Sequence, residues 1–154
     1  MPKVWIDGDG APRDVKEIVF RAAERRGVSV VLVANRPVAV PRHPLIRAVQ
    51  VPAGLDVADQ WIVRHAAAGE LVITSDLPLA AELVPLGVVA ISARGETYTA
   101  ANVRERLSLR DFFMEARAAG IVAGGGPPPF DAKAKKAFAE AFDRWLTAAA
   151  RSGA

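Results

Sequence analysis

The sequence predicts an α/β protein in which a largely parallel sheet of about five strands is flanked by helices. Short apolar segments alternate along the chain with segments whose apolar residues recur at helical spacing, an order typical of a parallel sheet with crossover helices. Most of the apolar segments are continuous and rich in β-branched residues, as expected for strands buried on both faces. With 154 residues, the chain is long enough for one domain with a substantial core.

The predicted elements follow one another in the order strand, helix, strand, strand, helix, strand, helix, strand. The strands are predicted at residues 4–6, 28–35, 46–51, 71–76 and 88–92. The helices are predicted at residues 12–27, 54–69 and 77–87, each with a glycine at its end. Residues 36–44 are too rich in proline for regular structure and are expected to form an exposed connection.

After residue 92 the chain is predicted to be mainly helical. Thr99 and Ser108 each have the side chain and the sequence context of a helix N-cap, and Asp131 is expected to cap a last helix. The apolar stripe of that helix consists of Ala134, Ala137, Phe138, Ala141, Phe142 and Trp145. We expect the stripe to pack on the sheet, with a dimer contact as the alternative.

The expected organisation has three parts. An α/β domain covers residues 1–123, a Gly/Pro linker covers residues 124–130, and a C-terminal helix within residues 131–154 packs on the same domain.

The composition excludes several classes of protein. The chain has no cysteine, so disulfides, thiolate catalysis and cysteine-ligated metals are excluded. No apolar run approaches the roughly 20 residues that span a bilayer, and charged residues come too early for a signal peptide. We therefore expect a cytoplasmic protein with no membrane partner. The net charge of +3 is too small to indicate a partner by itself.

The candidate functional residues are five aspartates at or near the ends of predicted strands. Asp7 and Asp9 end the first strand, and Asp76 ends the fourth. Asp56 and Asp59 open the helix after the third strand. Because ligands of open parallel sheets bind at the carboxyl ends of the strands, and right-handed crossovers bring these loops to one rim, we expect the carboxylates to converge. Such closely spaced carboxylates repel one another unless a metal ion, a basic neighbour or exposure to water offsets the repulsion.

Four of the five aspartates also have a simpler interpretation. Asp9, Asp56 and Asp76 could cap the three helices, and Asp59 could be stabilised by a helix N-terminus. Asp7 comes too early in the chain to cap a helix, however, and capping does not account for its pairing with Asp9. As a group, these hard oxygen ligands indicate Mg²⁺ or Mn²⁺.

Other catalytic sites find little support in the sequence. His43 lies among prolines and His65 lies on the apolar stripe of a helix, so both are interpreted as structural. Neither a nucleophile elbow nor a glycine-rich phosphate loop is present.

A haloacid dehalogenase-like phosphatase is a lower alternative. The DGDG sequence at residues 7–10 is similar to the start of the motif of those enzymes. They also need a downstream lysine, and no lysine lies between Glu17 and Ala132. The threonine that normally follows the motif is replaced by Ala11.

Several longer motifs extend from about residue 4 to the linker: WIDGDGAP, VLVAN, GLDVADQWIV, LVITSDLPLAAE, ARGETYT and RERLSLRDFFMEARAAGI. They resemble the YaiI/YqxD family, also known as UPF0178 or DUF188. The fold of that family is similar to the PIN-like and NYN nucleases. The resemblance implies a Rossmann-like (PIN-like) three-layer sandwich with C-terminal helices and, by analogy, a metal-dependent nuclease acting on RNA.

The resemblance also implies roles for individual residues. Asp7 matches the leading aspartate of the superfamily, Asp56 and Asp59 match its acidic helix start, and Asp76 matches the aspartate of a T-x-D motif. The predicted catalytic residues are Asp7, Asp9, Asp59 and Asp76. The predicted ligands of Mg²⁺ or Mn²⁺ are Asp7, Asp9, Asp56, Asp59 and Asp76, and the bound ion would activate water for phosphodiester hydrolysis.

Two further residues are predicted to contact the substrate. Asn35 ends the second strand, and Arg94 follows the fifth. The alternative function is a non-catalytic module on the same fold, which would hold RNA or a protein partner with the basic residues of 102–117.

Overall fold

The structure is a computed structural model that describes residues 2–121 and 129–152. Its centre is a five-stranded sheet in which every pair of neighbouring strands is parallel. The strands are β1 (Val4–Asp7), β2 (Val30–Ala34), β3 (Ile46–Gln50), β4 (Leu71–Ile73) and β5 (Val89–Ile91). The predicted α/β class and the Rossmann-like, largely parallel sheet are therefore confirmed.

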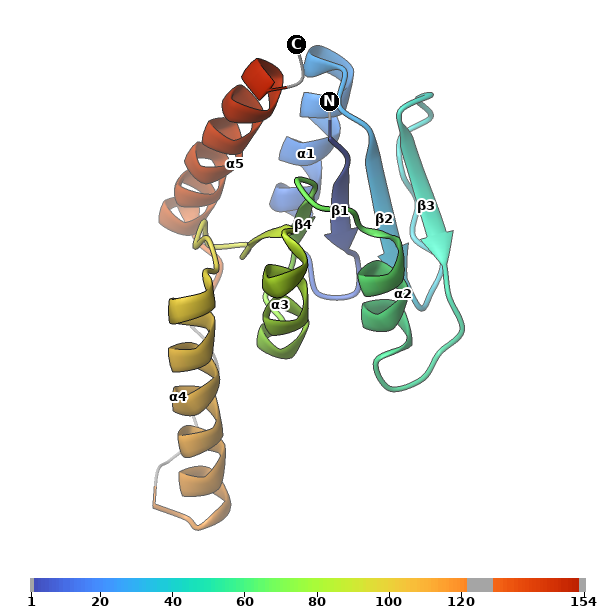
Figure 1. Cartoon of the computed structure of the whole chain (residues 1–154). Coiled ribbons are helices and arrows are strands. Elements are labelled where there is room, and N and C mark those ends of the chain that lie inside the picture. The colour runs from blue at the N-terminus through green and yellow to red at the C-terminus, as the bar shows by residue number, and fades with distance from the viewer. Residues whose placement is uncertain (1, 122–128, 153–154) are drawn as a thin grey trace.

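Helices cover both faces of this sheet (Figure 1). They are α1 (Arg13–Arg26), α2 (Val57–His65), α3 (Leu77–Leu83) with the 3₁₀ turn η1 (Val84–Leu86), α4 (Ala100–Ala118) and α5 (Ala132–Ser152). The first and last of them, α1 and α5, pack on one face, whereas α2 and α3 pack on the other. The N-terminal part of α4 packs beside α3.

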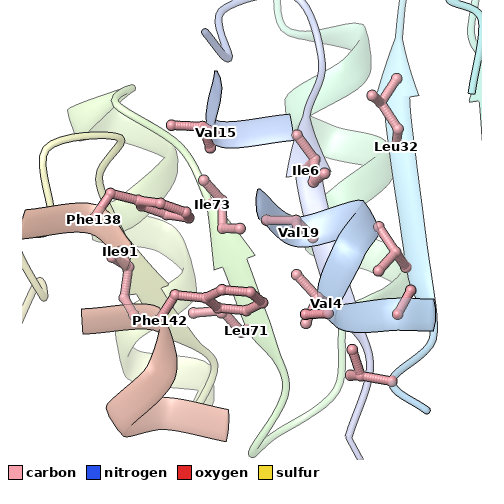
Figure 2. Close-up of a cluster of buried hydrophobic side chains, with 14 of the residues drawn as sticks. Val4, Ile6, Val15, Val19, Leu32, Leu71, Ile73, Ile91, Phe138 and Phe142 are labelled. Atoms are coloured by element: carbon pink, nitrogen blue, oxygen red, sulfur yellow. The ribbon is translucent and has the colours of Figure 1, made fainter. Parts of the chain in front are cut away.

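The alternation of side chains along β1 shows how the two layers are held. Val4 and Ile6 point to the α1 and α5 side, where they meet Phe138 and Phe142 of α5 in one buried cluster (Figure 2). Trp5 points to the opposite side and packs with α2 and α3. Because β1 is the central strand, both of its faces are apolar, and the strand reads as a continuous apolar run.

The strand order is β3-β2-β1-β4-β5. The chain therefore builds the sheet outward from β1 to one side and then returns to build β4 and β5 on the other side. The order reverses between β1 and β4, and in open α/β sheets the crevice outside the carboxyl ends of the strands at such a point is the usual ligand site. The fold places the end of β1, where Asp7 lies, beside that crevice.

Some predicted helix ends differ from the structure. The prediction of an N-cap at Ser108 is wrong, since this residue lies inside α4. The helix begins instead after Thr99, which forms a reciprocal capping box with Asn102. The second helix ends at His65, earlier than the predicted Gly69. Most of the predicted linker, residues 124–128, lies outside the described residues.

The last helix begins where the sequence predicts. The Asp131 carboxylate accepts a hydrogen bond from the Ala134 N–H at 2.9 Å, as an N-cap does.

Within the described residues, no helix combines the length and the apolar content that crossing a bilayer requires.

Truncation of Phe138 should test how strongly α5 contributes to the core. Phe138 is fully buried against the sheet, so Phe138→Ala should lower the free energy of unfolding by about 3–5 kcal/mol. The measurement is denaturant unfolding followed by circular dichroism. Lys136→Ala, an exposed change on the same helix, is the control, and equal stability of the two variants would contradict the role of α5.

Candidate active site

A pocket of about 440 Å³ opens at the carboxyl ends of the strands. Its walls come from the β1–α1 loop, the end of β2, the loop and first turn of α2, the β4–α3 connection and Ala93, the second residue after β5. The predicted site residues that line it are Asp7, Asp9, Asn35, Asp56, Asp59 and Asp76. Arg94 is not among the lining residues, although its neighbour Ala93 is. Among the described residues that line the pocket, none is basic.

Asp7 is held by a hydrogen bond across the two central strands. The hydroxyl of Thr74, which follows β4, donates to Asp7 Oδ2 at 2.9 Å. The same hydroxyl oxygen accepts from the backbone N–H of Asp76 at 3.0 Å. Thr74 is 3% exposed, so it has little freedom to turn away, and it sets the position of one Asp7 oxygen relative to the β4–α3 connection.

Asp76 caps a helix, as one interpretation of the sequence predicts, and also lies in the pocket. Its Oδ1 accepts a hydrogen bond from the Leu79 N–H at 3.0 Å and so caps α3. The residue also lines the pocket. A carboxylate has two oxygens, so a capping bond to one of them still leaves acceptor capacity for a ligand.

Asp9 does not cap the first helix. The N-cap of α1 is Pro12, which makes no side-chain hydrogen bond. The Asp9 carboxylate instead accepts from the backbone N–H of Asn35, at 3.0 and 3.3 Å to its two oxygens. Arg36 Nε lies 3.7 Å from Asp9 Oδ1. Asp9 therefore ties the β1–α1 loop to the end of β2 and brings one guanidinium to the edge of the pocket.

Asp56 and Asp59 reach the pocket from the start of α2. Asp56 occupies the N-cap position but makes no side-chain capping bond, so the capping interpretation is wrong for this residue. Its φ of 60° lies in the left-handed region, which costs a residue other than glycine about 1 kcal/mol or more. Asp59 lies in the first turn of the helix.

Burial and neighbouring charges raise the pKa values of two pocket carboxylates, Asp59 and Asp7. Burial is the main cause that raises the pKa of Asp59 to about 7, and the charges of Asp76 and Asp7 raise it further. A side-chain hydrogen bond with Asp76, which the protonated form of Asp59 makes, acts in the same direction. Burial also raises the pKa of Asp7, against the hydrogen bond from Thr74, which lowers it. Since none of the described lining residues is basic, the carboxylates that stay ionised are not neutralised by the pocket wall.

This chemistry fits a hard divalent cation, although a complete ligand shell is not preformed. In residues 2–121 and 129–152, no group of three or more Asp, Glu or His side chains is arranged to hold one metal ion. Magnesium usually binds to one or two carboxylates and completes its shell with waters and substrate phosphate oxygens. Two of the pocket carboxylates, such as Asp7 with Asp59 or Asp76, would meet that requirement.

The structure adds three residues that the sequence prediction did not include in the site. Thr74 positions Asp7, and the Ser75 hydroxyl accepts from the Ala93 N–H at 3.4 Å, joining the ends of β4 and β5. Leu55, which is 93% exposed, stands at the pocket. The T-S-D sequence after a buried strand was the available signal for Thr74 and Ser75, whereas no pattern marks an isolated leucine in a loop.

The fold and the pocket together define a class: α/β proteins with a parallel sheet in Rossmann-like order and an acidic pocket where the strand order reverses. Residues 5–148 match the family described as "Uncharacterized BCR, YaiI/YqxD family" (DUF188). The chain belongs to this YaiI/YqxD family, which confirms the resemblance seen in its motifs.

Individual relatives match over almost their whole length. A UPF0178 protein of Thioalkalivibrio sulfidiphilus is 54% identical over 144 residues, which cover 94% of this chain and 97% of the relative. A UPF0178 protein of Shewanella amazonensis is 50% identical over 144 residues, 94% of this chain and 96% of the relative. One from Bordetella petrii is 50% identical over 97% of this chain and 99% of its own. No solved structure gives a significant match.

Gly8 should be intolerant of a side chain. A Cβ at this position would meet Leu32 Cδ2 at 2.5 Å and the Val33 carbonyl oxygen at 3.0 Å, whereas a Cβ at Gly10 would meet nothing within 4 Å. We expect Gly8→Ala to lower the free energy of unfolding by about 1–3 kcal/mol through overpacking. Gly10→Ala is the matched control. Chemical denaturation of both variants gives the comparison, and a fully stable Gly8→Ala protein would contradict the close approach.

The raised pKa of Asp59 should make stability depend on pH. Between 3.8, its usual pKa, and about 7, the folded chain keeps a proton that the unfolded chain releases. Stability therefore falls as the pH rises through this range and levels off above it. Asp59→Asn lacks this loss, so it should melt at a higher temperature than the wild type at pH 8, and the two curves should converge toward pH 4.

Because Asp59 is partly exposed, solvent screens the repulsion, and the gain at pH 8 is smaller than the full pKa shift would imply. Thermal melts across the pH range, without divalent ions, measure the effect. A constant difference between the two proteins at every pH would contradict the assigned pKa.

Proposed function

We propose that this protein is a metal-dependent nuclease that hydrolyses RNA phosphodiester bonds in the acidic pocket. The observation that carries the proposal is the convergence of five aspartates from three loops on one pocket at the reversal of the strand order. Enzymes concentrate perturbed ionisable groups in a cleft because charge there can be matched to a reacting substrate. A purely structural set of helix caps would not require that concentration.

The pocket aspartates would have different roles in the proposed reaction. Asp7, positioned by Thr74, and Asp59 or Asp76 would hold Mg²⁺ or Mn²⁺, with Asp9 and Asp56 adding negative charge around it. When bound, such an ion supplies an activated water and stabilises charge on the leaving oxygen. Without a cation, the carboxylates would repel a phosphodiester, so substrate binding itself would depend on the ion.

Polar side chains at the edge of the pocket are placed to contact phosphate groups of an RNA backbone. Arg36 is 62% exposed while it stays 3.7 Å from Asp9, so its guanidinium is free to reach a neighbouring phosphate as well. Asn35 lines the pocket beside it. Arg94 follows Ala93 outside the pocket wall, and contact with the substrate from there remains part of the proposal.

The choice of RNA as substrate rests on the relationship to PIN-like and NYN nucleases that the resemblance of the motifs implies. The Rossmann-like strand order and the acidic carboxyl edge are compatible with that relationship. Fold likeness alone does not define activity, so the reaction must be measured directly. An RNA substrate would be met in the cytoplasm.

A cleavage assay tests the proposal. Purified protein is incubated with single-stranded and with structured RNA, in Mn²⁺ or in EDTA. We expect cleavage in Mn²⁺ only, and its loss in Asp7→Asn. Thr74→Val removes the hydrogen bond that positions Asp7, and loss of such a supporting partner typically lowers activity about 10–100-fold.

Two controls sharpen the assay. Asp14→Asn changes an aspartate of α1 outside the pocket and should cleave at the wild-type rate. Metal binding without cleavage of any nucleic acid would refute the nuclease. RNA binding that persists in EDTA and survives Asp7→Asn would instead identify the non-catalytic binding module.

A further inference from the structure

The distal half of α4 exposes an unusual amount of apolar surface. The described residues include seven large apolar side chains that are exposed, and five of them fall between residues 109 and 121: Leu109, Phe112, Phe113, Met114 and Ile121. Phe112 is 62% exposed and Phe113 is 44% exposed, and their rings lie 5.6 Å apart. Figure 1 shows this end of α4 extending beyond the sheet and the other helices. Of these five side chains, Leu109, Phe112 and Phe113 share one face of α4 at 100° per residue, and exposed apolar side chains gathered on one face usually mark an interaction site.

The packing of the described residues makes little use of this surface. The N-terminal half of α4 is anchored by Val103, which packs with Ala80 and Tyr98 in a small buried cluster. Farther along the helix only Ala116 is buried. The contacts with α3 therefore account for the apolar residues near the start of the helix, whereas Leu109, Phe112 and Phe113 are not covered by any part of the chain that the structure describes.

We infer that the distal half of α4 is the interface of a symmetric dimer, in which the helix packs against the same helix of a second copy of the chain. Charge supports this choice of partner. The face of α4 that carries Leu109, Phe112 and Phe113 also carries the acid Glu105 and the bases Arg110 and Arg117. Arg106, which lies beside this face, is already paired with Glu96 at 2.7 Å. An apolar face that carries charges of both signs on its two sides can be complementary to itself in a two-fold dimer.

The positions around the helix also determine how two copies would pair. At 100° per residue, Leu109 and Phe113 lie about 40° apart, and the line that joins them runs along one face of the helix. On one side of that line lie Glu105 and Phe112, and on the other side lie Arg110 and Arg117. The members of each pair are seven residues apart, so both sides continue over two turns.

A parallel pairing of the helices brings unlike sides together. It sets Glu105 of one copy against Arg110 of the other, five residues along, which is the offset of charge pairs across parallel coiled coils. The same offset sets Phe112 against Arg117, where a cation–π contact can form. In an antiparallel pairing, the two arginine-bearing sides would face each other and repel. We therefore assign a parallel arrangement about a two-fold axis.

Sedimentation measurements on the full chain test the dimer. The wild type should approach twice its 16.3-kDa mass as its concentration rises. Phe112→Asp and Phe113→Asp should each raise the dissociation constant about 30-fold or more, the effect of a central contact residue. Leu86→Asp changes an apolar residue that is 51% exposed but lies on η1, and it should dimerise as the wild type does.

A charge exchange tests the arrangement without disturbing the core, because both side chains are exposed. Glu105→Arg alone and Arg110→Glu alone should each weaken the dimer, and the double variant should recover most of the lost affinity. Circular dichroism confirms that every variant is folded. A wild-type chain that stays monomeric at all concentrations, or a dimer indifferent to the Phe112 and Phe113 changes, would overturn the interface. Failure of the double variant to recover would overturn the parallel arrangement.

Discussion

The site depends on the side-by-side parallel pairing of β1 and β4, which brings Asp7 and Thr74 within a 2.9 Å hydrogen bond. Strands that run in the same direction end at the same edge of the sheet. The loops that directly follow β1, β2 and β4 therefore all lie at that edge. The Thr74 hydroxyl converts this general arrangement into a particular one, because it orients one oxygen of Asp7 and receives the backbone N–H of Asp76. The strand order thus determines where the pocket lies, and the buried Thr74 hydroxyl determines how Asp7 is oriented in it.

The same arrangement costs stability. Burial and mutual repulsion raise the pKa values of Asp7 and Asp59, and Asp56 adopts a backbone conformation that disfavours side chains. The two apolar clusters on either side of the sheet compensate for these terms, since β2 is buried along its whole length and α5 inserts Phe138 and Phe142. Concentrated like charge at one edge of an otherwise well-packed domain is the pattern expected where function rather than stability selects the residues.

Local signals in the sequence identified most helices and strands, because the interactions that begin and end these elements involve residues close together in the chain. Gly27 closes α1 in the left-handed conformation and Asp131 caps α5, as their positions predict. Ser108 failed because it has the chemistry of an N-cap but stands after the helix has already begun at Thr99, and an interior serine is tolerated once neighbouring turns are packed. Asp9 and Asp56 also had the chemistry of caps, yet one is drawn to the backbone of Asn35 and the other makes no capping bond.

The sequence alone determined the α/β class, the approximate strands and the aspartates near the strand ends. These features can be predicted because the pattern of apolar residues that marks a helix or a strand is formed by residues close together in the chain. Only the tertiary structure decided which aspartates hold other groups. The Asn35 contact of Asp9 spans 26 residues and the Thr74 contact of Asp7 spans 67. It also decided that the apolar residues at the end of α4 stay exposed, since a helix carries the same pattern whether or not a partner covers it. Such contacts depend on which segments the sheet brings together, and no local pattern encodes that.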